Sequence, residues 1–214
     1  MSNEKVESRR RFLKDSSTIA AGTALAAGLN LGTARMVHAQ GNDKLKIALI
    51  GCGGRGNGAA SDNLKACENT EIVAVADAFQ DKAEGAAKRL GVAPEKTFWG
   101  FDAYKKAIDA GVEMVILATS PGFRPLVDSH CDLACQAMEA GKHVFMEKPC
   151  RVDAPGYRKL VEANALADQN GLKVGVGLQR RHDSGYVNGI QKIHDGKYGD
   201  LICLQAYWNG GGIW

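Results

Sequence analysis

The sequence has few cysteines and no arrangement of them that suits a metal. Its six cysteines include no C-x-x-C pair and no spacing typical of zinc sites. Cys131 and Cys135 are four residues apart and would share one face of a helix, but two ligands on one face do not make a metal site. We therefore expect no bound metal and interpret the cysteines as free, buried thiols, with a redox role for this pair as a remote alternative.

A surplus of positive charge is also absent from most of the chain. The sequence has 27 Lys and Arg against 24 Asp and Glu, and residues 1–39 contain six and three of these, which leaves 21 of each in the remainder. Proteins that bind nucleic acid release counterions from the phosphates through an excess of cations. The balanced charge excludes a nucleic-acid partner.

The N-terminus lacks an apolar run that could span a membrane. Residues 19–31 are rich in Ala and Gly and fall short of the ~20 strongly apolar residues required. They follow SRRRFLK (8–14), which matches the twin-arginine export pattern, and precede small residues at Val37 and Ala39 that suit a cleavage site. We expect residues 1–39 to be a twin-arginine signal peptide that engages the export machinery and directs a periplasmic protein. The alternatives are a basic amphipathic helix and a retained anchor.

The stretch from Lys44 to Gly58 organises the rest of the chain. An apolar run, 45–50, reads as a strand buried on both faces, and G-x-G-x-x-G follows it at Gly51, Gly53 and Gly56. The first glycine permits a tight turn, the second lets a pyrophosphate approach the backbone, and the third lets the next helix lie close to the strand. The free N–H groups of that helix would face the phosphates.

An acidic residue follows the second expected strand at the spacing of a dinucleotide site. Asp77 comes 21 residues after Gly56, close to the ~20 expected for the acid that binds a ribose 2′-hydroxyl. Its charge repels a 2′-phosphate, which favours NAD over NADP, although nearby Lys82 offers a compensating cation. The strand, the glycines and the acid together predict a dinucleotide site rather than an ordinary strand–turn–helix.

Strands and helices alternate along the chain, which predicts an α/β fold with a doubly wound parallel sheet of the Rossmann type. The expected strands are 45–50, 71–76, 96–99, 112–118, 142–146, 173–178 and 201–208. The expected helices are 56–67, 80–90, 102–110 with Asp102 as N-cap, 125–140, 153–170 and 184–194. We assign 44–170 to the nucleotide-binding domain and 171–214 to its last strand and the start of an incomplete second domain.

Ligands of open parallel sheets lie beyond the carboxyl ends of the strands, which places three loops at the site. These loops contain Thr119-Ser120-Pro121, Glu147-Lys148-Pro149 and 179–182. Lys148 fits an ordinary solvated loop lysine as well as it fits a site residue. Arg180 and Arg181 also fit a role in pairing with acids at the surface. For His182, a structural role in packing is the better interpretation. The expected cofactor-binding residues are Gly51, Cys52, Gly53, Gly54, Arg55, Gly56, Asp77, Thr119, Pro121, Glu147, Lys148, Gln179 and Arg180.

Four segments resemble the family of glucose–fructose oxidoreductase, inositol dehydrogenase and the MocA rhizopine protein. They are GCGGRG (51–56), VAD (75–77), ATSP (118–121) and, most specifically, AGKHVFMEKP (140–149). The resemblance implies a Rossmann domain followed by an open-sheet α/β domain, and hydride transfer between a nicotinamide and a sugar or cyclitol carbon. It also implies that Lys148 is catalytic, because the family's E-K-P lysine lies beside substrate and nicotinamide, where a cation orients a hydroxyl and favours its alkoxide.

The sequence departs from the family pattern in two places. The histidine that often follows the T-P turn is absent from residues 122–125, and the nearest one is His130, which we leave unassigned. No D-x-x-x-H acid–base pair occurs between Lys148 and Trp214. The chain therefore looks like the front half of a longer enzyme, one that we expect to be a homo-oligomer. Alone it would expose strand 201–208 and be poorly soluble or dimerise.

Three functions fit this pattern. The first is an exported NAD(P)-dependent oxidoreductase acting on a sugar-like substrate, with a cofactor that is held tightly and recycled in place because export delivers it beyond the cytoplasmic nucleotide pool. The second is an NAD-dependent glycosidase of the same family, for which Arg55 in the G-x-G-x-R-G turn is suggestive. The third is a non-catalytic nucleotide-binding fragment.

Overall fold

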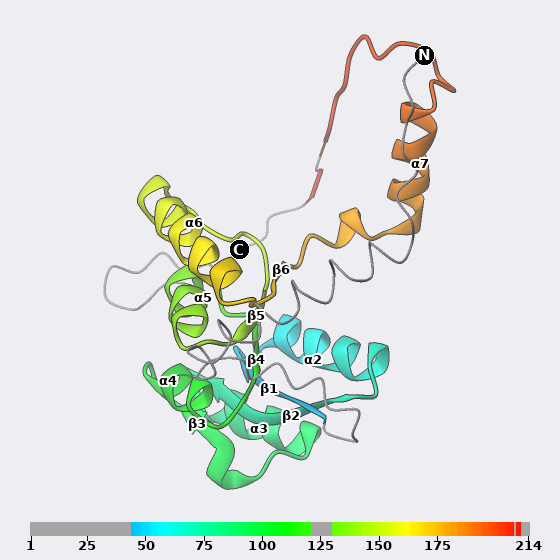
Figure 1. Ribbon diagram of the computed structural model, residues 1–214. Coiled ribbons are helices and arrows are strands. Elements are labelled where there is room, and N and C mark those ends of the chain that lie inside the picture. Colours follow the sequence, from blue (N-terminus) through cyan, green and yellow to red (C-terminus); the bar gives the residue numbers. More distant parts are fainter. Residues whose placement is uncertain (1–43, 121–129, 208, 211–214) are drawn as a thin grey trace, which may run out of the picture. The chain divides into compact units, whose positions relative to one another are not determined.

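The computed structural model describes residues 44–120, 130–207 and 209–210, and within them six strands form one parallel sheet. The strands are β1 (Leu45–Ile50), β2 (Thr70–Asp77), β3 (Thr97–Trp99), β4 (Met114–Leu117), β5 (His143–Met146) and β6 (Val174–Val176). Their order is β3-β2-β1-β4-β5-β6 (Figure 1). The order reverses between β1 and β4, which confirms the doubly wound Rossmann-type sheet.

Helices cover both faces of this sheet. One face carries α2 (Gly54–Ala66) and α3 (Gln80–Leu90), and the other carries α4 (Ala103–Ile108), α5 (His130–Glu139) and α6 (Ala154–Gln169). A last helix, α7 (Ser184–His194), follows β6. The crevice between β1 and β4 therefore opens at the carboxyl ends of strands that are packed on both sides.

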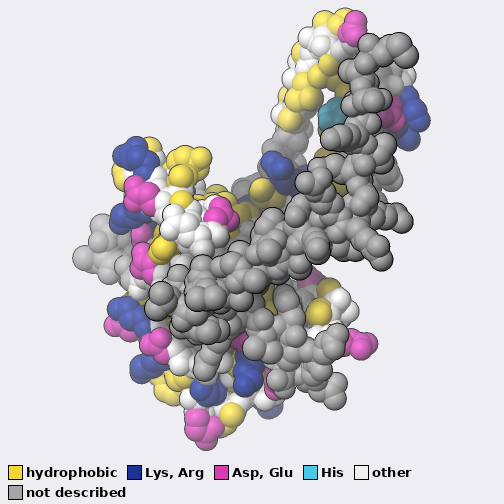
Figure 2. All heavy atoms as spheres, in the orientation of Figure 1, with side chains coloured by type: hydrophobic (Ala, Val, Ile, Leu, Met, Phe, Trp, Pro, Cys, Tyr) yellow, Lys and Arg dark blue, Asp and Glu magenta, His cyan; other side chains and the backbone are white. Residues whose placement is uncertain are grey.

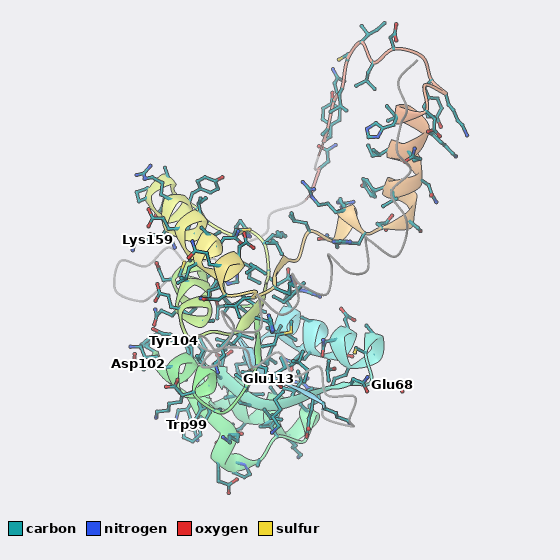
Figure 3. The ribbon with its side chains drawn as sticks, viewed as in Figure 1. Glu68, Trp99, Asp102, Tyr104, Glu113 and Lys159 are labelled. Atoms are coloured by element: carbon teal, nitrogen blue, oxygen red, sulfur yellow. The ribbon has the colours of Figure 1, made fainter. Side chains whose placement is uncertain are left out.

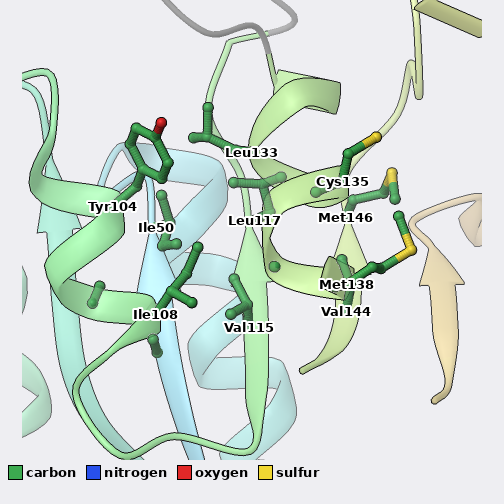
Figure 4. Close-up of a cluster of buried hydrophobic side chains, with 14 of the residues drawn as sticks. Ile50, Tyr104, Ile108, Val115, Leu117, Leu133, Cys135, Met138, Val144 and Met146 are labelled. Carbon is green, nitrogen blue, oxygen red and sulfur yellow. The ribbon is translucent and has the colours of Figure 1, made fainter. Parts of the chain in front are cut away.

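The strands are mostly apolar because each face of the sheet has its own core. In β1, Ile47 and Leu49 face α2 and α3, whereas Ala48 and Ile50 face the opposite layer. Figure 4 shows that second core, where side chains of α4 and α5 meet those of β4 and β5. One polar group enters it: the hydroxyl of Tyr104 donates a hydrogen bond to Gln136 Oε1 (2.9 Å).

Helix α2 lies unusually close to the end of β1 because Gly56 has no side chain. A Cβ placed on Gly56 would lie 1.8 Å from the carbonyl oxygen of Gly51. No rotamer change relieves a clash between a Cβ and a backbone atom, so the helix would have to move. This confirms the packing role predicted for the third glycine.

Most predicted elements are present with shifted ends. Helices α3 and α7 have the predicted bounds, and α2 begins two residues earlier than predicted, directly after Gly53. Asp102 is the N-cap residue of α4, as predicted, but its carboxylate accepts no N–H of the helix and pairs instead with Lys105 Nζ (2.8 Å). The first part of the helix predicted over 125–140 lies outside the described residues.

The strand predicted over 201–208 is not formed in the residues that are described. Residues 201–207 have no regular secondary structure, and Ile202 is 97% exposed. A strand needs a hydrogen-bonding neighbour, and within the described ranges this segment pairs with none. Trp208 lies outside the described residues.

The coloured surface shows no region of one charge. On the face in Figure 2, Lys and Arg side chains are interspersed with Asp and Glu. In the part of the chain that the structure describes, no helix combines the length and apolarity needed to cross a bilayer.

We predict that Gly56→Ala lowers the free energy of unfolding by about 3 kcal/mol, because the new Cβ meets the Gly51 carbonyl. Urea denaturation followed by circular dichroism measures this. The matched control is Gly85→Ala in exposed α3, where a Cβ meets nothing within 4 Å and should add about 0.5–1 kcal/mol. Equal stabilities of the two variants would contradict the close packing of α2.

Candidate functional site

The glycine-rich turn joins β1 to α2 and leaves a bare surface at the start of the helix. Gly51 has a φ of +93°, and a Cβ on it would lie 2.7 Å from the backbone of Ala118 after β4. Gly53 differs, because a Cβ there would meet nothing within 4 Å. The fold therefore requires glycine at positions 51 and 56. At position 53 the fold would tolerate a side chain, and glycine there only keeps the exposed backbone accessible to a ligand.

The side chain of Asn57 holds this turn in shape. Its Nδ2 donates hydrogen bonds to the carbonyl oxygens of Cys52 (2.6 Å) and Gly53 (2.9 Å). These carbonyls are therefore turned toward α2. The N–H groups of the first helical turn have no acceptors within the helix, and those of Gly54 and Arg55 belong to exposed residues. Sequence reasoning missed Asn57, because an Asn inside a helix is common without such a role.

Asp77 connects the end of β2 to the same turn. Its Oδ2 accepts the N–H of Cys52 (2.6 Å) and its Oδ1 accepts the N–H of Phe79 (3.0 Å). An ionised carboxylate has about four lone-pair sites, so two acceptor positions remain for a ligand hydroxyl. The predicted ribose-binding acid thus also fixes the glycine-rich turn.

Cys52 contributes its backbone to the site and its thiol to the core. The thiol lies in the core on the α2 face and donates a hydrogen bond to the carbonyl of Ala76 (3.4 Å). Burial, reinforced by the negative charge of Asp77, raises the pKa of Cys52 to about 12. The group therefore stays a neutral thiol and is not a nucleophile.

His130 joins the loops that follow β4 and β5. It is 3% exposed, its Nε2 lies 2.8 Å from the carbonyl oxygen of Glu147, and its Nδ1 lies 3.0 Å from the hydroxyl of Thr119. Burial lowers the pKa of His130 below its ordinary value. Because a carbonyl only accepts, the neutral ring carries its proton on Nε2 and accepts the Thr119 hydroxyl at Nδ1. No role was predicted for His130, because it lies 11 residues after Thr119 in the chain.

A cleft of about 420 Å³ opens beside the turn. Its polar lining consists of Arg55, Asp62, Glu147, Lys148, Gln179 and His182. The structure thus brings together the predicted residues of the glycine-rich turn and of the loops after β5 and β6. Within the described residues, the Lys148 ammonium makes no hydrogen bond or ion pair, so it is available to a ligand.

Two of these loop residues differ from expectation, and a third cannot be placed. His182 is exposed and lines the cleft, so the packing role favoured for it is wrong. Arg180 donates to the hydroxyl of Tyr186 and its guanidinium lies 5.0 Å from the centre of that ring, which directs it toward α7. Pro121 lies outside the described residues.

Aromatic side chains that the sequence did not single out flank Asp77. Phe79 is 67% exposed, and Trp99 and Phe101 are also exposed at the end of β3, where Trp99 pairs with Asp77 in the sheet. Figure 3 shows Trp99 near α4 at this edge of the sheet. Exposed aromatic rings beside Asp77 provide apolar surface for a planar ligand group.

Residues 45–178 match the family model described as "Oxidoreductase family, NAD-binding Rossmann fold", named Gfo/Idh/MocA. The chain is 33% identical over 168 residues to an inositol 2-dehydrogenase of Salmonella typhimurium, covering 76% of this chain and 45% of that protein. It is 28% identical over 167 residues to a scyllo-inositol 2-dehydrogenase (NAD(+)) of Bacillus subtilis, covering 77% and 44%. The chain therefore spans less than half the length of these relatives.

The fold is similar to that of solved dehydrogenases. The scyllo-inositol dehydrogenase of Lactobacillus casei, solved with bound NAD(H) and scyllo-inositol, matches with a TM-score of 0.60 and 28% identity over 74% of this chain and 43% of that one. The myo-inositol 2-dehydrogenase of Lactobacillus plantarum matches with a TM-score of 0.64 and 25% identity, over 75% and 44%.

We predict that His130 makes stability fall on acidification. Its pKa is lower in the folded than in the unfolded chain, so the unfolded state takes up the proton first as the pH drops below about 6.5, and the free energy of unfolding falls by up to about 1.4 kcal/mol per pH unit. Chemical denaturation at pH 7.5 and 5.5 measures this. His130→Gln should be less stable at pH 7.5 and show a weaker pH dependence, whereas the exposed control His194→Gln should behave like the parent. A variant His130→Gln with the parent's full pH dependence would contradict the assignment.

Proposed function

Because this chain belongs to the Gfo/Idh/MocA oxidoreductase family with an NAD-binding Rossmann fold, we propose that it is the nucleotide-binding half of an NAD-dependent dehydrogenase. Its substrate would be a sugar or cyclitol hydroxyl, as the inositol dehydrogenases among its relatives suggest. The observation that carries the proposal is the bare backbone at Gly53 beside a cleft that contains Lys148, which has no hydrogen-bond or ion-pair partner among the described residues.

The residues of the turn fit a dinucleotide. The N–H groups of Gly54 and Arg55 at the start of α2, together with the positive end of the helix dipole, suit a diphosphate. The carboxylate of Asp77 retains acceptor positions for the hydroxyls of the adenosine ribose. Bound NAD would supply the nicotinamide carbon that exchanges hydride with the substrate.

The charges near Asp77 favour NAD over NADP. A 2′-phosphate would place its negative charge against the Asp77 carboxylate. The cation named above as a compensating charge, Lys82, has its Nζ 3.9 Å from Asp81 Oδ2, and both side chains are exposed. Its charge is therefore shared with a nearby acid and screened by water, which leaves Asp77 as the dominant group.

Lys148 is the proposed catalytic residue of the cleft. Its ammonium would donate a hydrogen bond to the reacting hydroxyl and stabilise the negative charge that develops on the oxygen as the C–H bond breaks. Its position depends on its neighbour Glu147, whose carbonyl is bound by His130. Thr119 fixes the other side of that histidine.

We predict that Lys148→Met lowers kcat for inositol oxidation in the complete protein by at least 100-fold while the Kd for NADH changes less than threefold, because the residue acts on the substrate. Absorbance of NADH at steady state and NADH fluorescence titration measure the two constants. The matched control is Lys159→Met on α6 (Figure 3), an exposed lysine 3.9 Å from Asp132. Full turnover by Lys148→Met would refute the catalytic assignment, and an absence of NADH binding by the parent would refute the function itself.

We also propose export, which the twin-arginine pattern of residues 8–14 supports. Expression in a bacterium followed by N-terminal sequencing of the periplasmic fraction should find a protein that starts at Gln40, and replacing Arg9 and Arg10 by Lys should abolish its appearance there. An uncleaved protein confined to the cytoplasm would rule the proposal out.

A further inference from the structure

An ion pair spans the crevice in which a dinucleotide would lie. Arg55 Nε donates to Glu147 Oε1 over 2.6 Å, and a second guanidinium nitrogen lies 3.7 Å from Asp62. Arg55 belongs to the first turn of α2, directly after the glycine-rich turn, and Glu147 directly follows β5. In the sheet β4 lies between β1 and β5 (Figure 1), so the pair reaches across the carboxyl end of β4.

Glu147 is fixed at its end of the pair by three contacts. Its N–H donates to the carbonyl of Leu117 (2.9 Å), and its own carbonyl accepts His130 Nε2. Its carboxylate lies against Gly177, where an added Cβ would come within 2.8 Å of Oε2. The Glu147 side chain is only 12% exposed, whereas that of Arg55 is 53% exposed. The carboxylate is therefore the fixed end of the pair and the arginine the movable one.

Arg55 retains donors for a ligand while it is paired. A guanidinium has five N–H donors, and the close contact with Glu147 uses the one on Nε. The nearest anionic group of a dinucleotide at the start of α2 would be its diphosphate, which is well matched to a guanidinium. One side chain can thus contact the bound nucleotide and the far wall of the crevice together.

We propose that the Arg55–Glu147 pair is a strap that retains the bound dinucleotide by slowing its release. This inference rests on the proposed function, because it requires that a nicotinamide dinucleotide occupies the crevice. A cofactor reused in place must dissociate slowly, and closing the crevice with an ion pair achieves this without a mobile domain. The strap joins the glycine-rich turn to the residue preceding Lys148. It therefore also holds the glycine-rich turn and the Lys148 loop at a fixed distance from each other.

The test is stopped-flow measurement of NADH binding and of its displacement by excess NAD. Arg55→Ala and Glu147→Gln should each raise the dissociation rate constant about tenfold, with the association rate constant within threefold of the parent. The double variant should release NADH no faster than Arg55→Ala alone, because removing the arginine already breaks its pair with Glu147. Arg158→Ala and Glu162→Gln, exposed residues of α6, serve as controls and should release NADH at the parent's rate.

Three outcomes would overturn the strap. Faster association with unchanged release would mean that the pair obstructs the crevice. A lower melting temperature with unchanged binding kinetics would mean that it only stabilises the fold. Multiplied effects in the double variant would mean that the two side chains act separately. A parent that does not bind NADH at all would instead refute the proposed function on which the strap depends.

Discussion

The contact between Gly56 and the carbonyl of Gly51 is the constraint on which the site depends. It allows the start of α2 to lie against the end of β1, with 1.8 Å separating a hypothetical Cβ from that oxygen. This approach aims the free N–H groups of the helix at the crevice between β1 and β4. It also brings Arg55 within reach of Glu147 on the far side of β4. A longer separation would weaken both the anion site and the pair that crosses it.

A network of hydrogen bonds extends this constraint to the loop that contains Lys148. Asp77 and Asn57 fix the glycine-rich turn: Asp77 accepts the N–H of Cys52, and Asn57 donates to the carbonyls of Cys52 and Gly53. His130 fixes the loop of Lys148 through its hydrogen bond to the carbonyl of Glu147. Since each of these groups binds a backbone atom, the site is positioned by main chain rather than by flexible side chains, which suits a reaction that demands fixed donor and acceptor positions.

The sheet and the glycine-rich turn were predictable from the sequence because their signals are local. Residues 45–50 are apolar except for Lys46 and do not alternate, which is typical of a strand buried on both faces, and the roles of Gly51 and Gly56 follow from their spacing. His130 and Asn57 were not predictable, since their partners lie up to 17 residues away or are backbone carbonyls whose direction only the fold defines. The segment 201–207 is largely apolar, as many strands are, yet strand formation also needs a hydrogen-bonding neighbour that composition does not reveal.

The central claim is that a dinucleotide diphosphate rests on the exposed backbone at the start of α2, and a structure of the protein determined with NAD bound tests it most directly. The account predicts diphosphate oxygens within hydrogen-bonding distance of the N–H groups of Gly54 or Arg55, with the adenosine ribose at Asp77. Nucleotide bound elsewhere on the protein, or a crevice that stays empty at millimolar NAD, would contradict it.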